Sequence, residues 1–123
     1  MAAKTYRELV AWQRAMDLVT EVYRVSRRFP RDETYGLTNQ LRRAAVSVPS
    51  NIAEGQGRGM GLEFARFLKI SQGSLQEMEK QLLIAERLGY VDAAALATIM
   101  AMADEVGRLL RGLSKSVGKC LTN

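Results

Sequence analysis

The chain has 123 residues, of which 47% are hydrophobic and 25% are charged, a composition typical of one globular domain. It contains no histidine and one cysteine, which excludes Cys/His zinc sites, Glu-x-x-His di-iron sites and an intramolecular disulfide. We therefore expect no metal and no cofactor. No apolar run reaches the roughly 20 residues of a membrane span, and the N-terminus lacks the apolar core of a signal peptide. These features predict a cytoplasmic protein without a membrane partner.

The net charge is +5, and thirteen of the eighteen basic residues are arginines. The planar guanidinium group suits two-pronged hydrogen bonding to phosphate or carboxylate. The charge therefore favours an anionic partner such as RNA or DNA, but does not identify it.

The first predicted helix spans about residues 5–29. Thr5 to Glu8 match a capping box, which predicts the helix start. Apolar residues then recur at helical spacing, and Pro30 ends the segment. The predicted apolar stripe consists of Leu9, Trp12, Met16, Val19 and Tyr23.

The second predicted helix spans about residues 33–56 and contains Pro49. A proline inside a helix removes one hydrogen bond and costs roughly 3 kcal/mol. The apolar spacing nevertheless stays in phase from Ala45 to Ile52, which predicts a helix that is kinked at Pro49 rather than ended there. We expect nearby polar side chains to bond to the disturbed backbone.

Alternating glycines follow in the segment EGQGRGMG, residues 54–61. A phosphate-binding loop would need a preceding strand and a following Lys-Ser/Thr pair, and this segment has neither. It is typical of a flexible connection between two helices.

The last two predicted helices span about residues 61–88 and 92–117. Gly89 is expected just beyond the third helix, and Asp92 is expected to cap the fourth. No segment has the pattern of a strand. The chain, residues 1–123, is therefore predicted to form one all-α domain, an antiparallel, up-down-up-down, left-handed four-helix bundle.

Polar residues border the apolar stripes of the second and third helices. One interpretation is a polar layer that fixes helix register or an oligomer contact, with Gly73 allowing a close approach. The other pairs Glu54 with Glu77 as acid and base. We favour the first, because no nucleophile–base pair is implied, and we expect no catalytic residue. The layer would consist of Ser47, Asn51, Glu54, Ser71, Ser74 and Glu77.

In an antiparallel bundle, many basic residues should gather at the end that holds the glycine segment. We expect a phosphate-binding surface there, with a separate arginine pair on the second helix. The alternative is that the cations of the fourth helix only complement its C-terminus. The candidate nucleic-acid-binding residues are Arg7, Arg42, Arg43, Arg58, Arg66, Lys69, Arg108, Arg111 and Lys115.

Assembly would require apolar surface outside the bundle core. Val10, Val22, Phe67 and Met102 are the candidates for such a surface.

Long segments of the chain resemble one known family. They are residues 9–16 (LVAWQRAM), 35–55 (YGLTNQLRRAAVSVPSNIAEG), 73–77 (GSLQE) and 88–90 (LGY). These segments resemble the 23S rRNA-intervening sequence proteins, a bacterial family of four-helix bundles. The resemblance implies an antiparallel bundle that assembles into a ring-like homopentamer and has no established catalytic residues. A related group comprises basic bundles of diversity-generating retroelements, which are accessory proteins that bind a reverse transcriptase and nucleic acid.

Charge, composition and resemblance together predict a non-enzymatic, oligomeric protein that binds nucleic acid through a basic end. The alternative is a protein–protein scaffold or accessory module without a nucleic-acid role of its own.

Overall fold

The computed structural model describes residues 5–59 and 61–122, with side chains described as far as residue 119. The helical elements are η1 (Tyr6–Glu8), α1 (Val10–Ser26), η2 (Arg31–Glu33), α2 (Leu37–Gln56), α3 (Leu62–Arg87) and α4 (Ala93–Thr122). The first four residues, on which the expected absence of a signal peptide rests, and the side chain of Cys120 lie outside the described part.

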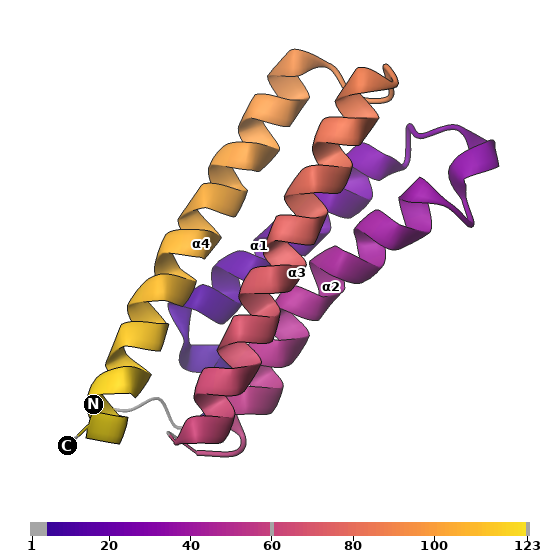
Figure 1. Cartoon of the computed structure of the whole chain (residues 1–123). Coiled ribbons are helices and arrows are strands. Elements are labelled where there is room, and N and C mark those ends of the chain that lie inside the picture. Colours follow the sequence, from indigo (N-terminus) through magenta and orange to yellow (C-terminus); the bar gives the residue numbers. More distant parts are fainter. Residues whose placement is uncertain (1–4, 60, 123) are drawn as a thin grey trace.

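The four long helices run alternately up and down along one bundle (Figure 1). Each helix packs against two neighbours, in the pairs α1–α2, α2–α3, α3–α4 and α1–α4, and the α2–α3 pair is the most extensive. The described residues contain no strand. The predicted all-α four-helix bundle is therefore confirmed.

The first helix begins later than the sequence predicts. The hydroxyl of Thr5 accepts a hydrogen bond from the backbone N–H of Arg7 at 3.2 Å, and so caps the short turn η1. Leu9 is then extended, with φ −75° and ψ 124°, and α1 starts at Val10. The ring of Tyr6 packs edge-on against Trp12 at 5.1 Å between centroids, which holds the turn against α1.

The buried face of α1 also differs from the prediction. The core stripe consists of Ala11, Ala15, Leu18, Val22 and Val25, whereas Met16 and Tyr23 are exposed. Both sets of residues recur at helical spacing, and the set with smaller side chains is the one that faces the core. The candidate assembly residue Val22 is completely buried.

Each of the other three helices buries one apolar stripe in the core. Their largest completely buried side chains are Leu41, Val48, Ile52, Phe64, Leu68, Met78, Leu82, Ile99, Val106 and Leu110. The predicted caps are also present. Gly89 follows α3 with φ 79°, and Asp92 accepts a hydrogen bond from the backbone N–H of Ala95 at 2.8 Å.

Helix α2 continues through Pro49 to Gln56. Three polar side chains donate to backbone carbonyls beside the proline. Ser50 bonds to the carbonyl of Val46, Asn51 to that of Ser47, and Ser71 of α3 to that of Val48, each at 2.8 Å. These bonds reach the three carbonyls that follow Ala45, whose own carbonyl loses its helical donor to the proline.

Gly55 allows the C-terminal half of α2 to approach α3 closely. A Cβ atom at this position would lie 2.7 Å from Cβ of Phe67 and 3.0 Å from Cδ1 of Phe64. Gly73, which the sequence suggested for this role, is exposed and has no such neighbour within 4 Å.

We predict that Gly55→Ala destabilises the bundle and Gly73→Ala does not. The first substitution overpacks the α2–α3 contact and should cost about 1–3 kcal/mol. The second removes a flexible residue from an exposed helix position and should stabilise by about 0.5–1 kcal/mol. Urea denaturation of both variants measures the two effects. Equal changes in the free energy of unfolding would contradict the assigned close contact.

Candidate nucleic-acid interface

The structure divides the nine candidate basic residues into three groups. Arg108, Arg111 and Lys115 lie on one side of α4, and we call them the α4 basic face. Arg7, Arg58, Arg66 and Lys69 come from η1, the α2–α3 connection and the first turns of α3. Arg42 and Arg43 lie in the first half of α2.

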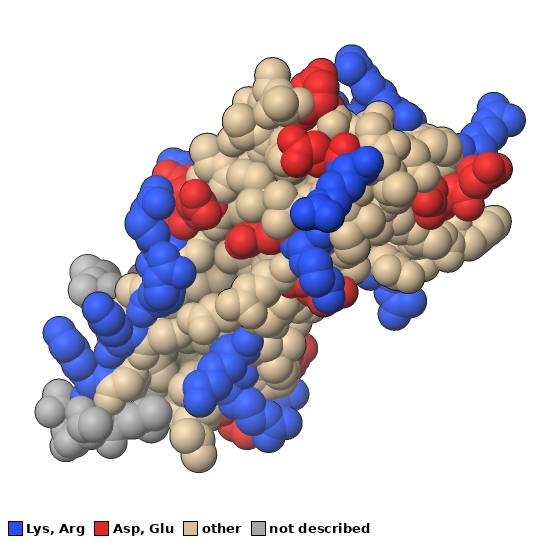
Figure 2. Space-filling view, turned by 45° about the horizontal axis from the view of Figure 1, so that its top comes forward, with Lys and Arg blue, Asp and Glu red and all other residues tan. Residues whose placement is uncertain are grey.

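All three side chains of the α4 basic face are exposed. Their spacings of three and four residues put them on one stripe of the helix. Among the described residues, none of the three makes an ion pair within 4.0 Å. Figure 2 shows Lys and Arg side chains projecting along the C-terminal half of α4. This face is therefore an open row of cations.

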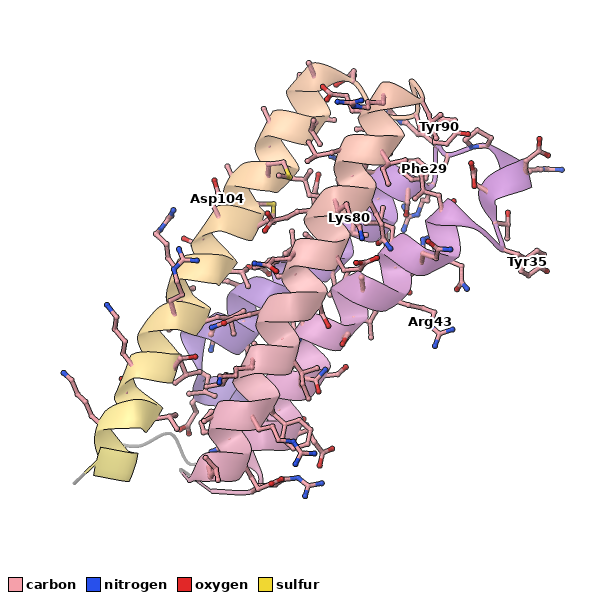
Figure 3. The ribbon with its side chains drawn as sticks, viewed as in Figure 1. Phe29, Tyr35, Arg43, Lys80, Tyr90 and Asp104 are labelled. Carbon is pink, nitrogen blue, oxygen red and sulfur yellow. The ribbon has the colours of Figure 1, made fainter. Side chains whose placement is uncertain are left out.

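Helix α3 presents a carboxyl group beside this row. Glu79 lines a pocket with Asp104, Arg108 and Arg111. Burial raises the pKa of Glu79 above its ordinary value, the charge of Asp104 raises it further, and the charge of Arg111 lowers it. Asp104 lies on α4 (Figure 3), so the basic face ends in an acidic patch toward the N-terminus of the helix.

The end of the bundle that holds the glycine connection is less basic than the sequence predicts. The guanidinium of Arg58 pairs with Glu54 at 3.1 Å and with Glu63 at 3.9 Å, and lies 5.1 Å from the ring centre of Phe67. Arg66 pairs with the same Glu63 at 3.6 Å. Two of the expected phosphate ligands are therefore already engaged with carboxylates.

The arginine pair of α2 does not join the α4 basic face, because α2 packs against α1 and α3. Arg42 is partly buried, and its Nε donates to the hydroxyl of Ser26 at 2.8 Å. Arg43 is exposed and projects away from the bundle (Figure 3).

Four of the six polar-layer residues meet in a seam between α2 and α3. The hydroxyls of Ser47 and Ser74 lie 2.8 Å apart, and the amide nitrogen of Asn51 donates to the hydroxyl of Ser47 at 2.9 Å. Ser71 completes the seam through the carbonyl of Val48. We call Ser47, Asn51, Ser71 and Ser74 the serine seam.

Glu54 and Glu77 lie outside this seam. Their side chains are 55% and 48% exposed, and they pair with Arg58 and with Lys80 respectively. Lys80 lies on α3, one turn after Glu77 (Figure 3). The two carboxylates thus pair with different cations, one in the α2–α3 connection and one on α3.

Sequence reasoning missed Glu79, Arg27 and Arg31. Glu79 directly follows Met78 of the α3 core stripe, and only its packing against α4 distinguishes it from other surface acids. Arg27 and Arg31 read as cations that complement the end of the first helix. In the structure, Arg27 and Arg31 line a pocket together with Arg42 and Arg43.

Within residues 5–59 and 61–119, no group of three Cys, Asp or Glu side chains is placed to hold a metal ion. None of the described helices is long and apolar enough to cross a membrane.

The sequence model of the 23S rRNA-intervening sequence protein family matches residues 7–112. No curated protein sequence matches the chain. Among solved structures, the chain is similar to a protein with unknown function from the S23 ribosomal protein family of Bacteroides thetaiotaomicron VPI-5482. The two share 19% sequence identity and a TM-score of 0.79, over 86% of this chain and 99% of that chain. At this identity, the similarity supports the fold.

We predict that Glu79→Gln stabilises the protein near neutral pH. The folded pKa of Glu79 is raised, so the native state holds this proton to higher pH than the unfolded chain does. Stability is therefore lost as pH rises from about 4 through the raised pKa. The variant should melt at a higher temperature than the wild type at neutral pH and at the same temperature below about pH 4. Thermal melts across this range test the prediction.

Glu86→Gln, which removes the same charge from the same helix, is the control. An equal, pH-dependent gain in that variant would attribute the effect to net charge rather than to the burial of Glu79.

Proposed function

We propose that this chain, which belongs to the 23S rRNA-intervening sequence protein family, is a non-enzymatic bundle that binds the phosphate backbone of nucleic acid through the α4 basic face. The observation that carries the proposal is the row of Arg108, Arg111 and Lys115, which are exposed and have no ion-pair partner in the described part of the chain.

The row suits a backbone rather than a base sequence. Its three cations span about 10 Å along the helix axis at 1.5 Å per residue. Cations at this spacing can neutralise successive phosphates and release their counterions. A bundle face without a groove-reading motif supports binding that depends on charge and geometry more than on sequence. Lys69 and Arg7 would extend the contact toward the end of the bundle.

The non-enzymatic part of the proposal is supported by the carboxylates. Glu54 and Glu77 each pair with a separate cation and are about half exposed. An acid–base pair requires two groups whose environments drive their pKa values apart around one substrate. The side chains of the serine seam are hydrogen-bonded to one another and to the α2 backbone.

A second candidate is a protein–protein module, and we propose that a second copy of this chain is its partner. A groove between α1 and α2 is lined mainly by apolar and aromatic side chains, with Met16 and Val46 41% and 39% exposed. Tyr6, Trp12, Val19 and Pro49 form most of the remaining wall. The family resemblance implies self-assembly, and this groove supplies apolar surface outside the core.

None of the four sequence-based candidates for assembly lines this groove. Val10 is exposed on α1, whereas Val22 is buried. Phe67 lies under the guanidinium of Arg58, and Met102 packs against the core.

We expect that replacing Arg108, Arg111 and Lys115 together by Gln weakens binding to single-stranded RNA and makes it less salt-dependent. Loss of three phosphate contacts should reduce the slope of log K against log salt concentration by roughly 2. Fluorescence anisotropy over a salt series measures this slope.

The matched control replaces Arg24, Arg28 and Arg87 by Gln, which changes the net charge equally at other sites. An identical slope in the two triple variants, or no binding by the wild type at low salt, would refute the α4 basic face as the binding surface.

Met16→Lys is expected to disrupt assembly, because it puts a charge into an apolar groove. Leu83→Lys, at a similarly exposed apolar position on α3, should leave assembly intact. Size-exclusion chromatography with light scattering reports the mass of each protein. A wild type that is monomeric at micromolar concentration would rule out the second candidate.

A further inference from the structure

A pocket of about 730 Å³ lies between the end of α1, the linker that contains η2, and the first half of α2. Figure 1 shows these segments together on the side of the bundle away from the C-terminus of α4. Four arginines contribute to its wall and no carboxylate does. We call Arg27, Arg31, Arg42 and Arg43 the arginine pocket.

Arg42 is held in place by its own neighbours. Its Nε donates to Ser26 at 2.8 Å, and its guanidinium carbon lies 4.6 Å from the ring centre of Tyr23. Neither terminal nitrogen of Arg42 makes a hydrogen bond or ion pair with another described residue. The side chain thus presents a positioned pair of donors whose orientation is already fixed.

The other three arginines are exposed and, among the described residues, have no carboxylate within ion-pair distance. The nearby Glu33 is engaged elsewhere. It accepts a hydrogen bond from the backbone N–H of Leu37 at 3.1 Å and another from the hydroxyl of Tyr90 at 2.9 Å. Neither Glu33 nor Asp32, the two carboxylates of this linker, makes an ion pair with an arginine of the pocket within 4.0 Å.

Thr38 is a further polar residue in the wall of the pocket. It lines the pocket and is 8% exposed, and its hydroxyl oxygen is buried without a hydrogen-bond partner in the described structure. A buried hydroxyl without a partner is unfavourable, and such groups in folded proteins call for an unseen partner.

We propose that the arginine pocket binds a terminal phosphate, that is, a phosphomonoester. Such a group carries close to two negative charges at neutral pH and offers three free oxygens to guanidinium forks. A backbone phosphodiester carries one charge, and a site that binds it must also leave room for the two flanking sugars. The pocket converges from three segments of the chain, which suits a compact group at the end of a molecule.

This site goes beyond binding of a backbone by the α4 basic face and does not rest on it. The terminal phosphate has two possible sources, a free nucleotide or the phosphorylated end of a nucleic acid, and the experiment below separates them.

The first test compares uridine 5′-monophosphate with uridine by isothermal titration calorimetry. The wild type should bind the nucleotide and not the nucleoside. The double variant Arg31→Gln/Arg43→Gln should weaken nucleotide binding by about tenfold or more, because each lost charged hydrogen bond is worth about that factor. Both side chains are exposed and lack ion pairs in the described structure, so the fold should be retained.

The control is Arg108→Gln/Arg111→Gln, which removes the same charge from the α4 basic face and should leave nucleotide binding unchanged. Equal weakening in both double variants, or equal binding of uridine and its monophosphate, would overturn the proposal. The salt dependence of RNA binding is measured separately, so failure of this pocket leaves the α4 basic face testable.

The second test compares a short RNA with a 5′-phosphate and the same RNA with a 5′-hydroxyl. If phosphorylation strengthens binding to the wild type and the α4 variant but not to the pocket variant, the source is a nucleic-acid end. If only the free nucleotide binds in a pocket-dependent way, the source is a nucleotide. Absence of both effects would refute the site.

Thr38→Val separates ligand binding from stability. Valine has nearly the same shape and removes the buried unpaired hydroxyl, so the melting temperature should rise. Binding of uridine 5′-monophosphate should weaken at the same time. Unchanged nucleotide binding in this variant would exclude Thr38 from the site.

Discussion

The close packing of α2 against α3 is the constraint on which the rest of the molecule depends. Pro49 removes a backbone donor inside α2, and its side chain lines the groove toward α1. Small residues permit the approach, because Gly55 leaves room for Phe64 and Phe67. The serine seam then joins the two helices, and one of its bonds runs from Ser71 to the carbonyl just before the proline. A polar cluster that looked suited to chemistry is thus used to hold a proline-containing helix against its partner.

This contact determines which charged surfaces can form. With α2 held between α1 and α3, its first half carries Arg42 to the end of α1, where Ser26 and Tyr23 fix the guanidinium. Helix α3, held on its other side by α4, brings Glu79 beside Arg111. The two basic surfaces therefore lie on different pairs of helices, although both depend on the same central contact.

Sequence periodicity predicted the buried faces of α2, α3 and α4 because each has one apolar stripe. It was wrong for α1, where two stripes at the same spacing compete and the one with Ala15 and Val22 faces the core. The resemblance to the family was visible in the sequence mainly through residues 35–55, the long segment around Pro49. The arginine pocket could not be predicted, because Arg27 and Arg42 come together only through the path of the linker, and no local pattern encodes that path. Ion pairing likewise decides that Arg58 is engaged and Arg108 is open, which depends on where carboxylates from other turns lie.

The two basic surfaces differ in the shape of anion that they can accept. The α4 basic face is a row on one straight helix, and an extended chain of phosphates can follow a row. The arginine pocket is a hollow bounded by three segments of the chain, and it contains one fixed guanidinium, that of Arg42. Adding charge to the row should increase affinity with little change in selectivity, since exposed cations act mainly through counterion release. Changing the pocket alters the geometry of individual hydrogen bonds, which is how a site distinguishes a phosphate end from a backbone. The net charge of +5 is thus divided between two surfaces of different geometry, which we propose as sites for two different kinds of anion.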